Sequence, residues 1–154
     1  MKLLFRQRFF SWLDSYDIFD EYGNTAYQVE GRLSWGHCLQ IFDRSGNAVG
    51  MVKEVVLAFL PRFQIFIQDQ LIGEIRKEFT LFKPRFHLDF NGWQVEGDIF
   101  EWDYKVSSGS ETIMRASKRI WNLTDTYEIE IMKPENALFS LMIVLAIDAA
   151  KCPH

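Results

Sequence analysis

Apolar and polar residues alternate along most of the chain in short runs, which turn residues interrupt at spacings of roughly 8–12 residues. The alternation is strict at 126–131, where Thr and Glu alternate with Tyr and Ile. A period of two places successive side chains on opposite faces of a strand, so this pattern predicts about twelve strands between residues 2 and 131. They are expected at 2–7, 16–19, 25–30, 39–42, 48–53, 63–67, 71–78, 86–90, 93–97, 102–106, 111–120 and 126–131.

Two of the predicted turns are copies of one motif. Ile-Phe-Asp-x-x-Gly-Asn begins at Ile18 and again at Ile41, 23 residues later. In each copy the Asp side chain is expected to accept hydrogen bonds from backbone N–H groups, and the Gly supplies a left-handed residue, so both copies predict hairpins. Asn91-Gly92 predicts a further hairpin with a type I′ turn. The period does not continue, which excludes a solenoid.

The pattern changes after Pro134, which suits the first position of a helix. Residues 136–150 contain neither Gly nor Pro, and 137–147 are all apolar except Ser140. The predicted helix, at about 135–150, is therefore apolar on every side, and such a helix must be surrounded by protein or by lipid.

Length favours protein over lipid around this helix. Residues 136–150 span roughly 22 Å, whereas a bilayer core needs about 30 Å. Asp148 and Lys151 follow too soon for a longer apolar run, so a membrane span is the less favoured alternative. A helix about 10–12 Å wide is too wide for an eight-stranded barrel, but a larger one can enclose it. The sequence thus predicts one mainly β domain over 1–154, a closed antiparallel barrel of about twelve strands around a central hydrophobic C-terminal helix.

Composition and charge narrow the function classes. Aromatic residues make up 16% of the chain, which favours sheet, and the net charge of −4 gives no basic field for nucleic acid. Cys38 and Cys152 are the only cysteines, which suits a reducing compartment. Arg6 and Arg8 interrupt the apolar start of the chain, which is unlike a signal peptide. We therefore expect a cytoplasmic protein, either free or peripheral to a membrane.

Four features, taken in order along the chain, resemble a known family. They are the aromatic segment Phe10-Ser11-Trp12, the hairpin at 16–31 with its Val29-Glu30-Gly31, the second turn motif at Ile41, and the closing helix at 137–148. Together they cover roughly residues 3–152 and resemble the LURP-one-related family, which is grouped with the tubby C-terminal domain and the phospholipid scramblases. The chain looks like a small prokaryotic-type member.

The resemblance implies a twelve-stranded barrel threaded by a hydrophobic helix. It also implies a link to lipid, because tubby domains bind phosphoinositide headgroups at a basic patch and scramblases act on membrane phospholipids. This chain departs from scramblases in lacking a cysteine-rich segment, a Pro-rich N-terminal extension and an acidic run before the helix. The basic residues of tubby that bind the headgroup cannot be placed on particular positions here.

The histidines offer little for catalysis or metal binding. His37 and Cys38 are adjacent on a predicted strand, so they point to opposite faces and cannot chelate one ion together. His87 and Asp89 share a face, which suits a hydrogen bond at the barrel wall better than a catalytic pair. His154 is terminal, and no nucleophile elbow, P-loop, dinucleotide turn or zinc spacing is present. We expect no enzyme activity, metal site or cofactor.

Basic residues give the ligand hypothesis. Arg76 and Lys77 fall near the end of one predicted strand, while Lys83 and Arg85 flank Pro84 in the next connection. Together they are the first choice for gripping a phosphorylated headgroup or an anionic membrane surface through charge-assisted hydrogen bonds. The alternative is a solvated strand face balanced by acidic residues. Less favoured basic groups are Arg6 with Arg8, and Arg115 with Lys118 and Arg119.

Three functional hypotheses remain. The first is a non-enzymatic tubby-like module that binds an anionic lipid headgroup or another phosphorylated ligand. The second is a protein-interaction domain, which requires exposed aromatic residues such as Trp12, Trp35 or Trp102 to form a patch. The third is a scramblase-like membrane protein, which requires the helix to leave the barrel.

Asp148, near the helix end, is expected to act as a structural anchor, paired with Lys151 or with donors on the barrel wall.

Overall fold

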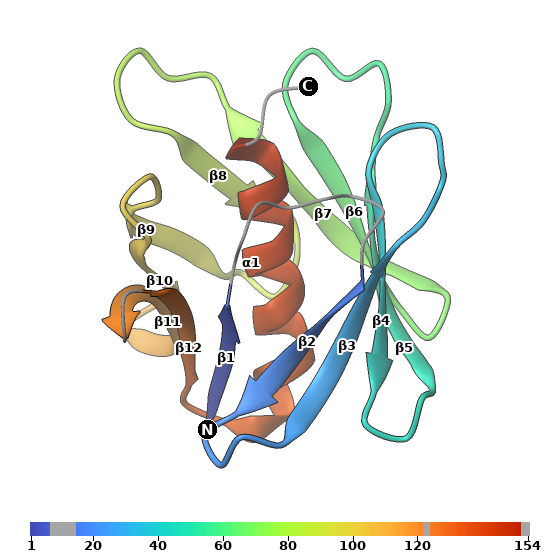
Figure 1. The fold of residues 1–154 in the computed structure, drawn as a ribbon. Coiled ribbons are helices and arrows are strands. Elements are labelled where there is room, and N and C mark those ends of the chain that lie inside the picture. The colour runs from blue at the N-terminus through green and yellow to red at the C-terminus, as the bar shows by residue number, and fades with distance from the viewer. Residues whose placement is uncertain (7–14, 122–123, 152–154) are drawn as a thin grey trace.

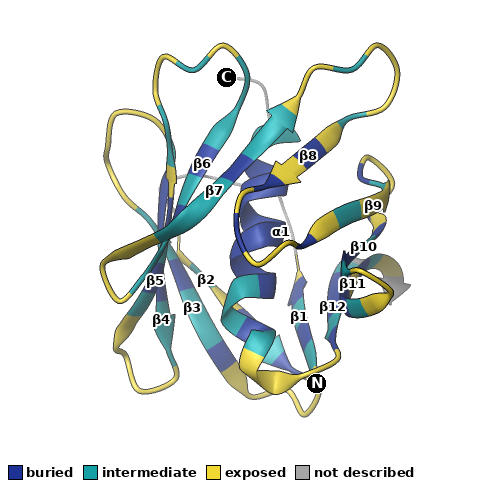
Figure 2. Ribbon diagram, turned by 180° about the vertical axis from the view of Figure 1, so that it is seen from behind, coloured by how far each residue is buried: buried dark blue, intermediate teal, exposed yellow. Residues whose placement is uncertain are grey.

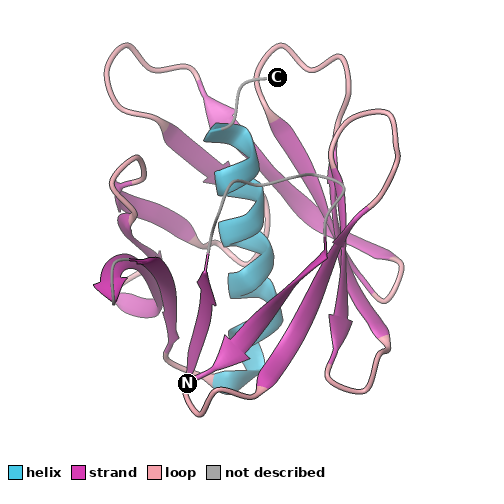
Figure 3. Ribbon diagram, viewed as in Figure 1, coloured by secondary structure: helices cyan, strands magenta, loops and turns pink. Residues whose placement is uncertain are grey.

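The computed structural model describes residues 1–6, 15–121 and 124–151, in which twelve antiparallel strands form a closed barrel around one helix (Figure 1; Figure 3). The predicted fold class is therefore confirmed. The strands are β1 (Lys2–Arg6), β2 (Ser15–Asp20), β3 (Thr25–Gly31), β4 (Cys38–Asp43), β5 (Ala48–Glu54), β6 (Arg62–Ile67), β7 (Gln70–Glu78), β8 (Arg85–Leu88), β9 (Gln94–Asp98), β10 (Asp103–Ser108), β11 (Glu111–Trp121) and β12 (Thr124–Ile131). The short 3-10 helix η1 (Pro134–Asn136) leads into α1 (Ala137–Lys151).

Each strand pairs with its neighbour in sequence, and β1 closes the barrel between β2 and β12. In such an up-and-down barrel, successive connections lie at alternate ends. One end, which we call the turn end, also holds the N-terminus and has the connections 21–24, 44–47, 68–69, 89–93 and 109–110. The other end, which we call the loop end, also holds the end of α1 and has the described connections 32–37, 55–61, 79–84 and 99–102 (Figure 1).

Helix α1 fills the barrel interior. Residues 141–147 are 0% exposed, and inward-facing strand residues such as Ile65 and Ile75 complete the core around them (Figure 2). A Cβ atom at Gly50 on β5 would lie only 3.0 Å from Met142 Sδ, so the absent side chain lets the helix approach this wall closely. None of the helices in the described part of the chain has the length and apolar content that a membrane span needs.

The two copies of the Ile-Phe-Asp-x-x-Gly-Asn motif form matching turns. In each copy, Asp20 or Asp43 accepts hydrogen bonds at its Oδ1 from the backbone N–H groups two and four residues later, all at 2.9 Å. Gly23 and Gly46 have φ of 84° and 82°, the left-handed conformation that glycine adopts most readily. The predicted hairpins are confirmed, and they are built from the same hydrogen bonds.

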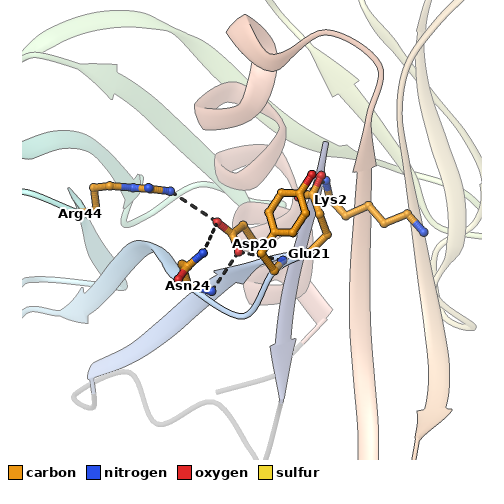
Figure 4. A network of polar contacts seen from close by, with 6 residues as sticks. Lys2, Asp20, Glu21, Asn24 and Arg44 are labelled. Atoms are coloured by element: carbon orange, nitrogen blue, oxygen red, sulfur yellow. Dashed lines mark hydrogen bonds and ion pairs between the residues drawn. The ribbon is translucent and has the colours of Figure 1, made fainter.

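The second copy also supports the first (Figure 4). Arg44 Nη2 lies 3.5 Å from Asp20 Oδ2, and the backbone N–H of Lys2 donates to Glu21 Oε2 at 3.1 Å. The backbone N–H of Asn24 is the main cause that lowers the pKa of Asp20, and the charge of Arg44 acts in the same direction. These contacts lie beside the β1–β2 pairing, which has only two residue pairs. Among the described strands only the β8–β9 pairing is shorter, so the contacts reinforce a short stretch of pairing in the barrel wall.

Trp102 does not lie on the surface. It is 6% exposed, its φ is 55°, and its ring centroid lies 5.8 Å from that of Phe5 and 4.3 Å from that of Tyr127. The strand expected from residue 102 starts one residue later, because Trp102 turns inward within the preceding connection. The expectation that Trp102 contributes to an exposed aromatic patch is therefore wrong. Trp35 is exposed, and Trp12 lies outside the described residues.

Candidate functional site

Three basic side chains lie in a row across the outer face of β6, β7 and β8. Arg62 is paired with Arg76, and Arg76 is paired with His87. They face outward because Ile75 and Phe86, next to them in sequence, point into the core. We call these three residues the basic row.

A hollow of about 720 Å³ lies beside the basic row. Residues 55–60 of the β5–β6 connection form one side of it, and the basic row with Lys77, Glu78 and Phe79 forms the other. We call it the arginine hollow. As far as the structure describes them, its lining residues include no Ser, Thr or Cys, so the hollow offers cations, one carboxylate and apolar groups.

Arg76, at the centre of the row, has the least compensated charge. Arg62 Nε lies 3.6 Å from Glu74 Oε2. No carboxylate of a described residue lies within 4.0 Å of the Arg76 guanidinium, whose Nε is buried and has no hydrogen-bond acceptor in the described part of the chain. Two arginines directly opposite each other on neighbouring strands repel, and an anion placed between them relieves that repulsion.

The structure separates the four predicted residues into two pairs. Arg76 and Lys77 both line the arginine hollow, although they leave the strand on opposite faces. Lys83 and Arg85 line a different hollow of about 550 Å³, where Lys83 Nζ is 4.0 Å from an oxygen of Asp98. The two hollows adjoin, since Glu78 and His87 line both of them.

Sequence reasoning missed Arg62 and His87. Neither is near Arg76 in sequence, and only the pairing of β6, β7 and β8 brings them together. The one signal that points to them is strand alternation combined with the correct register, and register depends on turn geometry as well as on the apolar pattern.

Lys77 also lines a second hollow, of about 350 Å³, at the loop end of the barrel. Its other lining residues include Glu54, Phe86 and the last turn of α1 at 149–151. This hollow lies next to the arginine hollow, with which it shares Lys77. Lys77 therefore lies between the arginine hollow on the outer face and the smaller hollow at the loop end.

The histidines occupy ordinary positions. His37 donates its backbone N–H to Glu54 Oε2 at 2.9 Å, and its Nε2 lies 3.8 Å from the same oxygen, while Cys38 is buried. His87 and Asp89 are exposed, and the hydrogen bond expected between them is not formed. Within 1–6, 15–121 and 124–151, no three His, Cys, Asp or Glu side chains are grouped to hold a metal ion.

Asp148 lies inside the barrel, where α1 reaches the loop end, and is 5% exposed. Tyr16 on β2 and Tyr104 on β10 face it from the wall. Burial raises the pKa of both tyrosines well above the usual value, and the negative charge of Asp148 raises it further. Lys151 Nζ lies 4.6 Å above the Trp102 ring. The helix end is thus surrounded by polar side chains of the wall, an arrangement that suits an anchor.

Comparison with known proteins agrees with the fold. The profile of the LURP-one-related family matches residues 1–148. The uncharacterized protein YxjI of Bacillus subtilis (strain 168) is 29% identical over 149 residues, which cover 96% of this chain and 92% of that protein. The X-ray structure of a protein from Arabidopsis thaliana has a TM-score of 0.61 at 16% identity and covers 96% of this chain and 90% of that one. Because the family profile spans almost the whole barrel and its helix, this chain belongs to the LURP-one-related family.

Proposed function

We propose that this protein is a non-enzymatic binding module that holds a phosphorylated group, such as an anionic lipid headgroup, in the arginine hollow. The observation that carries the proposal is the basic row, in which the charge of Arg76 has no carboxylate partner among the described residues. We place this activity in the cytoplasm, at the surface of a membrane.

The chemistry of the row suits an anion such as phosphate better than a neutral ligand. A guanidinium presents several N–H donors in a plane and can donate two parallel hydrogen bonds to a phosphate group. Arg62 and His87 flank it at neighbouring strand positions, so they are placed to donate to other oxygens of the same group. Lys77 lines the same hollow and adds a mobile positive charge.

Calorimetric titration with inositol trisphosphate, and separately with inorganic phosphate, tests the proposal. We expect inositol trisphosphate to bind and Arg76→Gln to weaken binding about tenfold or more, because a hydrogen bond to a charged group contributes about 1.5–3 kcal/mol. Lys77→Gln should have a smaller effect. Lys83→Gln and Arg85→Gln should have the smallest effects, since these residues line a different hollow.

Arg115→Gln is the matched control. Arg115 is an exposed arginine on β11, and its replacement changes the net charge by the same amount without touching the arginine hollow. Equal weakening by Arg76→Gln and Arg115→Gln would assign the binding to overall charge and overturn the proposal. Absence of binding by the wild-type protein would do the same.

A further inference from the structure

Exposed apolar side chains are concentrated at the loop end. Of the thirteen large apolar residues that are exposed in the described part of the chain, nine lie in loop-end connections. Seven of them, which we call the apolar tips, are Leu33, Trp35, Leu57, Phe59, Leu81, Phe82 and Phe100, with exposures of 89, 86, 100, 94, 81, 93 and 61%. They come from four separate connections, all at the loop end (Figure 2).

Folding does not explain these residues. A leucine that is 100% exposed contributes no burial to the core, and Leu57 also has φ of 72°, a left-handed conformation that disfavours a leucine. Large contiguous apolar surfaces on soluble proteins commonly mark sites of interaction with proteins or membranes.

The tips are held in place by contacts below them. The β3–β4 and β5–β6 connections pack together, since a Cβ atom at Gly36 would lie 2.8 Å from Val56 Cγ2. The backbone N–H of Glu54 donates to the His37 carbonyl at 2.7 Å, and the Glu54 carboxylate accepts from the His37 N–H. In the next loop, the Thr80 hydroxyl donates to the Lys83 carbonyl, which closes a turn under the two tips there.

Charge is distributed unequally between the two ends. At the loop end, Arg32, Lys77 and Arg85 form no ion pair with a described residue, although the carboxylates Glu78, Asp98 and Glu101 lie at the same end. These three basic residues add to the uncompensated Arg76 of the basic row. The basic side chains Lys2, Arg44 and Lys133 of the turn end are instead engaged in ion pairs. The carboxylates at that end include Asp20, Glu21, Asp43, Asp69, Asp89 and Glu135. The loop end therefore offers basic side chains without an ion-pair partner among the described residues, and these can contact an anionic surface.

We propose that the loop end docks onto an anionic lipid bilayer, with the apolar tips inserted at the boundary between headgroups and acyl chains. Tryptophan, phenylalanine and leucine beside lysine and arginine are the residues that favour this boundary. Tips on four separate loops suit a deformable bilayer, whereas a protein partner would need a shaped recess for each. The proposal rests on the proposed function in one respect: the arginine hollow, at the same end, would then face a lipid headgroup.

Co-sedimentation with vesicles of phosphatidylcholine, with and without phosphatidylserine, tests the docking. We expect binding to the anionic vesicles and a roughly tenfold or greater loss in the double variant Phe59→Ser/Phe82→Ser, because each phenylalanine transfers its apolar area out of water. Tyr22→Ser is the matched control, an aromatic residue that is 84% exposed at the turn end. The thermal melting temperature checks that each variant is folded.

Fluorescence gives the position of the loops. Trp35 is 86% exposed, so its emission should shift to shorter wavelength when anionic vesicles are added, and Trp35→Phe should remove that shift. An emission that does not change while the protein sediments with vesicles would contradict insertion at this loop and overturn the proposed orientation.

Titration with soluble inositol trisphosphate separates the two proposals. If Phe59→Ser/Phe82→Ser loses the vesicles but retains inositol trisphosphate, the tips act independently of the anion site and the docking proposal stands. If the wild-type protein binds inositol trisphosphate but not vesicles, docking is overturned and the proposed function remains. Binding to neither overturns both. A concentration-dependent dimer that the same double variant abolishes would assign the tips to self-association and overturn docking.

Discussion

At the turn end the connections between strands hold two to five residues and are rich in Asp, Asn and Gly, whereas the described connections at the loop end hold four to seven residues and carry the apolar tips. The turn-end residues are occupied in hydrogen bonds that shape the turn, as at Asp20 and Asp43. The apolar tips at the loop end contact water instead. The turn-end connections therefore consist mainly of residues that shape the fold, whereas the loop-end connections also carry apolar residues that the fold does not need.

The largest difference is expected when the same substitution is made in the core and at a tip. Leu141→Ala, at a position that is 0% exposed, should lower the free energy of unfolding by about 2–5 kcal/mol, because it leaves a cavity beside the barrel wall. Leu81→Ala, at 81% exposure, should change it by no more than about 0.5 kcal/mol. Urea unfolding at neutral pH measures both. A large loss of stability in Leu81→Ala would mean that this tip is packed in solution, and would contradict the contrast between the core and the tips.

A second contrast uses two glycines with similar backbone conformations. Gly46→Ala at the turn end has only a conformational penalty of about 1–2 kcal/mol, since its φ is 82° and a Cβ atom would meet nothing within 4 Å. Gly36→Ala at the loop end, with φ of 87°, should lose more stability, because its Cβ atom would also collide with Val56. Equal losses in urea unfolding would show that the contact between the two loops is not kept in solution.

The aspartates of the turn motifs and the buried tyrosines near the loop end should respond to pH in opposite directions. At the turn end, hydrogen bonds from the N–H groups of Asn24 and Asn47 are the main causes that lower the pKa of Asp20 and Asp43. The unfolded chain therefore binds protons more readily than the folded one, so stability is present above pH about 4 and falls as the pH drops below that value.

At the loop end the sign is reversed. Burial, and then the charge of Asp148, raises the pKa of Tyr16 and Tyr104. The unfolded chain loses these protons first, so stability is present below pH about 10 and falls as the pH rises above it. Unfolding midpoints measured across the pH range should show that Asp20→Asn/Asp43→Asn reduces the loss of stability at acid pH. Tyr16→Phe/Tyr104→Phe should reduce the loss of stability at alkaline pH. Any exchange of these two effects would contradict the assignment.

The smallest expected effect is a gain. Leu57→Gly removes a leucine from a left-handed conformation, which should raise the free energy of unfolding by up to about 1 kcal/mol after the extra freedom of glycine in the unfolded chain is subtracted. The same variant should bind anionic vesicles less well. A substitution that stabilises the protein and weakens docking would show that Leu57 contributes to vesicle binding and not to the stability of the fold. Unchanged docking would remove Leu57 from the apolar tips.

The sequence predicted the architecture because the architecture depends on local patterns. Alternation with period two, the two Asp-x-x-Gly-Asn turns and an all-apolar helix too short for a bilayer are each readable without any knowledge of contacts. Together they allowed the barrel and its central helix to be predicted with nearly correct strand limits.

The candidate site was predicted only in part, because it depends on register. Arg76 and Lys77 were singled out, but Arg62 and His87 become neighbours of Arg76 only through strand pairing, and the β6–β7 pair contains a register shift between Ile65 and Phe66. The tips were missed for a related reason. Residues 55–60 are all apolar, a composition typical of a buried strand, yet they form a loop with exposed side chains.

Helix α1 follows all twelve strands in the sequence but occupies the centre that they surround. During synthesis the ribosome therefore releases each strand with its inward apolar side chains uncovered, and no strand meets its main packing partner until α1 has been made. Final closure of the wall should be late and cooperative rather than stepwise. A chain that stops before Ala137 would keep every turn signal and lose the segment around which its walls collapse.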